Sequence, residues 1–99
     1  MTTLCDEINK FGKGVGNAAR YRILEALFKG RKTVNELVGI VKLSQPAVSQ
    51  HLKTLKECNL VLDERRGQEI FYEINSQYTL KLLKNFASEI HKQQKSSNH

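Results

Sequence analysis

Residues 44–67, SQPAVSQHLKTLKECNLVLDERRG, contain two hydrophobic periods in succession. The first period is helical, and Ser44 can cap its first turn by accepting a hydrogen bond from a backbone amide. The apolar stripe of this helix consists of Val48, Leu52 and Leu55. After Asn59 the period falls to two, which predicts a β-strand, and Arg66-Gly67 predicts a tight turn because glycine tolerates a positive φ. The stretch therefore predicts a polar helix followed by a basic β-hairpin.

The flanking segments predict further helices and the second strand of the hairpin. Three glycines between positions 12 and 16 predict the end of the first helix, and Thr33 with Glu36 fits a capping box that starts a later helix. Ser76 is expected to cap the last helix. Helices are expected at 3–13, at 17–29, from 33, from 44 and at 77–93, strands at 60–65 and 69–74, and a disordered tail at 94–99. This order predicts an α+β, mainly helical fold, a winged helix-turn-helix with about five helices and one β-hairpin wing, in a single domain over residues 1–99.

The bulk composition limits the classes of function. The chain has 99 residues, enough for one domain, and 16 Lys and Arg against 10 Asp and Glu give a net charge of +6, which favours an anionic partner such as nucleic acid. No apolar run is long enough to cross a membrane, and the N-terminus lacks a secretion signal. The 2 widely spaced cysteines then predict reduced thiols and a cytoplasmic location. No catalytic or phosphate-loop motif occurs, so we expect neither an enzyme nor a bound cofactor.

Parts of the chain resemble the ArsR/SmtB family of small bacterial repressors. The residues that carry the resemblance are SQPAVSQHLKTLKECNLV followed by ERRGQEIFYEI, together with the upstream GNAARYRIL, and it extends from about residue 17 to about residue 74. The resemblance implies a homodimeric winged-helix regulator that represses transcription by binding an inverted-repeat operator in double-stranded DNA. In that family the first and last helices form the dimer interface.

The helix that begins at Ser44 is the expected reader of DNA. The second helix of a helix-turn-helix enters the major groove with its N-terminal residues near the bases, which places Gln45, Ser49 and Gln50 there. Ser44 and Lys53 are better placed for phosphates. The alternative is a surface helix whose polar face is simply solvated.

The hairpin tip and one histidine complete the expected DNA-binding set. Arg65, Arg66 and Gln68 lie at the tip, where the arginines could reach the backbone or the neighbouring minor groove. His51 lies at the edge of the apolar stripe, and we expect it to pack or to bind phosphate rather than to ligate a metal. Each of these residues taken singly could be solvated.

The terminal helices carry more apolar surface than one small core requires. The first helix contributes Leu4, Ile8 and Phe11, and the last contributes one stripe of Leu80, Leu83, Ala87 and Ile90 beside a second of Leu82 and Phe86. Surplus apolar surface at the termini predicts a homodimer formed by residues 3–13 and 77–93. The alternative is that both stripes pack within the monomer.

The metal sites of the family's common sensors are absent. Arsenic and cadmium sensors carry Cys-x-Cys just after a Glu-Leu that corresponds to Glu36-Leu37, where this chain has Val38-Gly39-Ile40. The positions that correspond to the zinc ligands of other members hold Ser76, Tyr78, Glu89 and Lys92. We therefore expect no metal site.

The cysteines leave two interpretations open. Cys58 resembles a cysteine of a cadmium- and lead-sensing subgroup, but this chain has Thr54 where that subgroup has a second one. One interpretation makes Cys58 a small buried hydrophobe, and the other makes Cys5 and Cys58 a redox or soft-metal sensor.

Two rival functions remain beside a regulated repressor. One is a constitutive regulator without an effector, and the other is a winged-helix module that binds an acidic protein. Preference for a defined inverted repeat over random duplex distinguishes a DNA reader from the protein-binding module.

Overall fold

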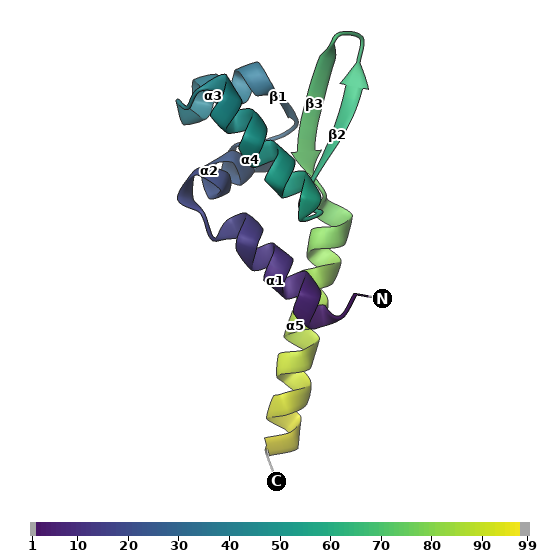
Figure 1. Cartoon of the computed structure of the whole chain (residues 1–99). Helices are drawn as coiled ribbons and strands as arrows, with labels where there is room; N and C mark the ends of the chain where they lie inside the picture. The colour runs from purple at the N-terminus through teal and green to yellow at the C-terminus, as the bar shows by residue number, and fades with distance from the viewer. Residues whose placement is uncertain (1, 98–99) are drawn as a thin grey trace.

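The structure, a computed structural model that describes residues 2–97, confirms the predicted winged helix-turn-helix (Figure 1). Its elements are α1 Leu4–Val15, α2 Ala18–Phe28, β1 Lys32–Thr33, α3 Val34–Val41, α4 Gln45–Glu57, β2 Val61–Arg66, β3 Glu69–Ile74 and α5 Ser76–Ser97. The 3 strands form an antiparallel sheet in the order β1-β3-β2. The short strand β1, which sequence reasoning missed, pairs Thr33 with Phe71 and so attaches the middle of β3 to the helical body.

The core lies where α2, α3 and α4 meet the base of the wing. Its buried members are Ile23, Leu24, Ala26, Leu27, Leu37, Val41, Val48, Leu52, Leu55, Cys58, Leu60 and Val61. The predicted stripe of α4 is fully inside, so this helix is held by its apolar face and presents its polar face outward. Phe28 of α2 lies outside this core and is 62% exposed.

Helices α3 and α4 begin where their caps were predicted. The Thr33 amide donates to the Glu36 carboxylate at 2.9 Å, and the Glu36 amide donates to the Thr33 hydroxyl at 3.2 Å, which completes the capping box. The hydrogen bond from the Thr33 amide lowers the pKa of Glu36. At the next helix the Ala47 amide donates to the Ser44 hydroxyl at 3.3 Å.

The predicted end of α1 is wrong, because the helix continues through Gly12 and Gly14 and stops at Gly16. Gly14 is buried, and a β-carbon there would lie 2.5 Å from Leu60 Cδ1. Glycine is therefore needed at this position for the close approach of α1 to Leu60 and not for a helix end. Arg20 then caps the helix, since its guanidinium donates to the carbonyls of residues 13 and 14 at 2.7 and 3.1 Å.

The predicted cap of the last helix is also wrong. Asn75, not Ser76, caps α5, because its side-chain oxygen accepts from the Tyr78 amide at 3.4 Å. The helix ends at Ser97, later than the predicted residue 93, and residues 98–99 of the predicted tail lie outside the described range. Its C-terminal half extends beyond the body of the molecule, whose longest dimension is 58 Å (Figure 1).

The wing is a regular hairpin with a 2-residue loop. Arg66 pairs with Glu69, so Arg66 is the last residue of β2 and the loop consists of Gly67 and Gln68, one residue later than the predicted turn. Gly67 has a φ of 63°, a conformation that favours glycine in a tight hairpin turn.

One junction joins α4, the wing and α5. Asn59 has a φ of 64°, and the amides of Asn59 and Leu60 donate to the carbonyls of Lys56 and Leu55 at 2.9 and 3.0 Å. These bonds form a Schellman ending to α4, with asparagine in the place that glycine usually takes. Asn75 closes the junction, because its side chain donates to the Asn59 carbonyl at 3.0 Å and its amide to the Leu60 carbonyl at 2.9 Å.

We predict that Gly14→Ala destabilises the protein by about 1–2 kcal/mol. The added β-carbon overlaps Leu60, which is 2% exposed and cannot move without displacing the core. The matched control is Gly12→Ala in the same helix, where nothing lies within 4 Å of the new atom, and better helix propensity should stabilise by up to about 1 kcal/mol. Urea unfolding measures both changes. A Gly14→Ala protein as stable as the wild type would refute the packing role of Gly14.

Candidate nucleic-acid interface

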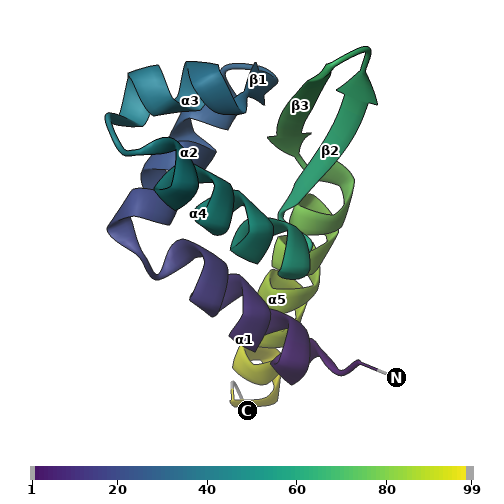
Figure 2. The same cartoon turned by 45° about the horizontal axis from the view of Figure 1, so that its top comes forward.

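Helix α4 presents one continuous polar face to solvent. Gln45, Ser49, Gln50 and Lys53 are all exposed; Gln50 and Lys53 lie opposite the buried stripe, and Gln45 and Ser49 lie on its flank. In Figure 2 α4 crosses the middle of the molecule, and its C-terminal end meets the base of the wing. The predicted reading helix therefore ends directly at the predicted wing.

The residues at the start and on the flank of α4 make more contacts within the protein than the residues on its outer face. Ser44 is exposed, but its hydroxyl accepts the capping hydrogen bond from Ala47, which leaves its own proton for a phosphate. His51 is half-buried at the edge of the core, as expected for a packed histidine.

Lys42 is a candidate phosphate contact that sequence reasoning missed. It is exposed between α3 and α4, with a φ of 57°, and its amide donates to the Val38 carbonyl at 2.9 Å. It therefore stands immediately before the amino end of the reading helix, where the helix dipole favours anions. A lysine in the turn of a helix-turn-helix is the signal that could have identified it.

The strand register places the two arginines of the wing on opposite faces. Directly paired residues share a face of the sheet, and Arg65 pairs with Ile70 while Arg66 pairs with Glu69. The inner face includes Val61, Asp63, Arg65, Ile70, Tyr72 and Ile74, and the outer face includes Leu62, Glu64, Arg66, Glu69, Phe71 and Glu73. Val61 is buried in the core, so the inner face is the one that turns toward α4.

The inner face is linked to α4 by an ion pair. Lys56 of α4 donates to the Asp63 carboxylate at 2.7 Å, and this hydrogen bond raises the pKa of Lys56. Asp63 is thereby paired with Lys56, and the residue directly opposite Arg65 in the register is the uncharged Ile70. Arg65 is consequently better placed than Arg66 to approach DNA beside the reading helix.

The outer face holds Arg66 in an ion-pair chain. Arg66 Nε donates to the Glu64 carboxylate, and Arg31 Nη2 lies 3.6 Å from the same carboxylate. Arg31 also lies over the Phe71 ring, 4.7 Å from its centroid. The hydrogen bond from Arg66, together with the charges of Arg66 and Arg31, lowers the pKa of Glu64. Gln68, the remaining tip residue, is exposed in the loop.

A separate apolar surface runs along α5. Leu82 is 2% exposed, whereas the exposed apolar side chains of α5 are Leu80, Leu83, Phe86 and Ile90, which we call the α5 surface. The described residues therefore do not follow the alternative in which both predicted stripes pack within one chain.

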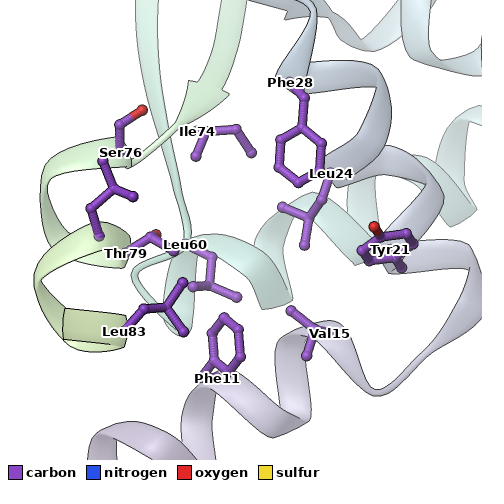
Figure 3. A pocket seen from close by; sticks show the side chains of 11 residues that line it. Phe11, Val15, Tyr21, Leu24, Phe28, Leu60, Ile74, Ser76, Thr79 and Leu83 are labelled. Carbon is purple, nitrogen blue, oxygen red and sulfur yellow. The ribbon is translucent and has the colours of Figure 1, made fainter. Parts of the chain in front are cut away.

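An open cavity of about 350 Å³ adjoins the α5 surface, between α1, α2 and α5 (Figure 3). Phe11, Leu24, Phe28 and Leu83 point into it. Its walls are almost entirely carbon, and the Thr79 hydroxyl beside it lacks a hydrogen-bond partner among residues 2–97. The cavity extends the apolar surface from α5 onto the neighbouring helices.

The two cysteines lie apart within one chain. Cys5 is exposed in the first turn of α1, whereas Cys58 is 3% exposed at the end of α4. Cys58 Cβ would contact a β-carbon at Gly14, and Gly14 lies nine residues after Cys5, a helical rise of about 13 Å. A disulfide needs α-carbons within about 7 Å, so this conformation does not permit one between them.

Metal-binding clusters and membrane-spanning helices are both absent from the described residues. Over the described part of the chain, no three His, Cys, Asp or Glu side chains lie close enough together to hold a metal ion. None of the helices within that part is long and apolar enough to cross a bilayer.

Comparison with known proteins places this arrangement in a family. The sequence profile described as "Bacterial regulatory protein, arsR family" matches residues 17–62. The transcriptional repressor SdpR of Bacillus subtilis is 32% identical over 69 residues, which cover 70% of this chain and 77% of SdpR. The nodulation protein NolR of Rhizobium meliloti is 41% identical over 73 residues, or 74% of this chain, although the chain spans only 60% of NolR.

A solved structure with the same fold comes from Mycobacterium bovis. The homodimeric winged helix-turn-helix DNA-binding domain of Mb0332, a possible ArsR-family transcriptional regulator, has a TM-score of 0.74 and 24% identity, and the match covers 97% of this chain and 89% of that domain. The protein described here is a winged helix-turn-helix transcriptional regulator of the DNA-binding type. It belongs to the arsR family of bacterial regulatory proteins, and the predicted family resemblance is thus confirmed.

We predict that Cys5 and Cys58 differ in reactivity by at least about 100-fold. An exposed thiol reacts directly with a maleimide, whereas a buried one reacts only when the structure opens locally. The Cys5→Ser variant isolates Cys58, and denaturant should restore its full labelling rate. Equal rates for both thiols in the native protein would show that Cys58 is accessible and would revive it as a candidate sensor.

Proposed function

We propose that the protein is a homodimeric, sequence-specific repressor that binds an inverted repeat in double-stranded DNA. Helix α4 lies in the major groove of each half-site and the wing lies along the adjacent backbone. The observation that carries the proposal is the arrangement of α4, whose apolar stripe is buried while Gln45, Ser49 and Gln50 are exposed at its amino end. Glutamine and serine are suited to the edges of bases in that groove.

The charges around α4 support the same assignment. Lys53 on its outer face, Lys42 in the preceding turn and Arg65 on the inner face of the wing surround the polar face with cations. Phosphate contacts of this kind orient a protein on the duplex, and the bases are then read by the helix between them. The net charge of +6 favours association with DNA.

The α5 surface and its cavity support assembly with a second copy. A single helix that exposes Leu80, Leu83, Phe86 and Ile90 leaves an apolar strip unburied in the monomer. A two-fold pair of reading helices would then match a two-fold DNA site. Mb0332, a protein of this fold, is a homodimer, and SdpR is a repressor.

The remaining parts of the proposal concern the class and the location of the protein. We assign no catalytic activity and no resident cofactor, and we place the protein in the bacterial cytoplasm, where its DNA lies. Regulation through Cys5 and Cys58 is retained as a hypothesis only for contacts between protomers, since one chain keeps the two residues apart. Binding to an acidic protein in place of DNA is the alternative outcome of the experiment that follows.

We predict that Gln50→Ala relaxes sequence preference. Duplexes selected from a random pool by the wild type would supply the operator, and affinities for it and for random duplex are then measured. Loss of a base contact should weaken operator binding by about 1–3 kcal/mol and leave random-duplex binding nearly unchanged. The matched variant is Arg65→Ala, which should weaken both duplexes alike and flatten the salt slope by about one. If selection enriches no sequence, the protein does not read DNA in the way proposed.

We predict that Ile90→Glu dissociates the dimer. An unpaired carboxylate in an apolar interface costs several kcal/mol, so the dimer dissociation constant should rise by at least about 10-fold in sedimentation experiments. Ile40→Glu is the control, because Ile40 is 48% exposed and Ile90 47% exposed, but Ile40 lies on α3. Dissociation by Ile40→Glu and not by Ile90→Glu would place the interface elsewhere.

A further inference from the structure

The outer face of the wing carries a carboxylate between two guanidinium groups. Glu64 accepts a hydrogen bond from Arg66 and lies 3.6 Å from Arg31. Arg31 is held in turn by the Phe71 ring at 4.7 Å, and Phe71 is anchored by strand pairing to both Glu64 and Thr33. Arg31, fixed on the Phe71 ring, thus positions the Glu64 carboxylate. The carboxylate in turn holds Arg66 at the tip of the wing.

We infer that Glu64 is an internal counter-ion that competes with DNA phosphate for Arg66 and so lowers the affinity of the wing for any duplex. This inference rests on the proposed function, because it requires the wing to lie beside DNA. A carboxylate occupies a guanidinium in the same way as a phosphate, through charge-assisted N–H···O bonds. Arg66 must release Glu64, or share its remaining donors, before it can bind the backbone.

The neighbouring charges strengthen this competition. Glu69 lies directly across from Arg66, and Glu64 and Glu73 share the same face, so Arg66 is the only cation of the outer-face strand residues. Glu69 lies within one Debye length, about 10 Å at about 0.1 M salt, of a phosphate that contacts the tip, whereas Glu73 lies four residues further along the strand, about 13 Å from the tip. Glu64 therefore lowers the affinity of the wing by occupying Arg66. Arg65, on the inner face, is not subject to this pairing.

As a consequence, the wing lowers the regulator's own affinity for non-specific DNA. Base contacts by α4 are unaffected, whereas the sequence-independent contribution of the wing is reduced. A protein that must locate one operator among many competing duplexes gains discrimination when non-specific affinity is low. Glu64 is then a positioning residue that acts through Arg66 and touches no base.

The test is a salt series of binding to random duplex by the wild type and Glu64→Gln. Glu64→Gln should bind about 3- to 10-fold more tightly at about 50 mM salt, with a salt slope steeper by about one because Arg66 now meets a phosphate. In an Arg66→Ala background the same substitution should change affinity by less than about 2-fold. Glu73→Gln removes the same charge from the same face opposite Leu62, and it should also have less than about a 2-fold effect.

The outcomes separate the inference from the proposed function. A wild type that binds duplex with the expected salt dependence but is matched by Glu64→Gln overturns the inference alone, as does weaker binding by Glu64→Gln. A gain that persists in the Arg66→Ala background also overturns it, because the effect would then be one of general charge. A wild type that binds no duplex at any salt removes the proposed function, and the inference with it.

Discussion

The hydrogen-bonded junction at Asn59 is the constraint on which the arrangement of the molecule depends. Its left-handed turn ends α4 and starts the wing, and Asn75 ties α5 to the same two residues. Leu60 is buried beneath this turn, where Gly14 lets α1 approach. Because four elements meet within a few residues, neither the wing nor the terminal helices can rotate freely against the reading helix.

Local signals predicted the parts of the fold that local interactions determine. The caps at Thr33 and Ser44 were located correctly, because each depends on residues three positions apart. The helix breaks assigned to Gly12 and Gly14 were wrong, since Gly14 is required by a contact with Leu60, far away in sequence. The two-residue strand β1 has no periodicity to detect, and only its pairing with β3 defines it.

In the candidate site, too, local sequence signals predicted some features, whereas contacts between distant residues could not be predicted. An exposed polar face on α4 follows from the spacing of its buried stripe, so residues such as Gln50 could be assigned to that exposed face before the fold was known. The alternation of the strands also implies that Arg65 and Arg66 face opposite ways. The alternation also puts Glu64 beside Arg66 on one face, but the sequence offers no signal that Arg31 reaches Glu64 from outside the hairpin or that Lys56 reaches Asp63 from α4. Such contacts depend on the fold and not on local sequence spacing.

The opposed faces of the wing have an evolutionary consequence. Side chains alternate along a strand, so one codon inserted or deleted within β2 would exchange the faces of every residue between that point and the loop. Arg65 would then move to the solvent side and Arg66 to the side of α4, while the core and the reading helix kept their residues. Length changes in the hairpin thus offer family members a way to alter their electrostatic footprint in one step. A series of point substitutions would have to pass through intermediate charge patterns to reach the same result.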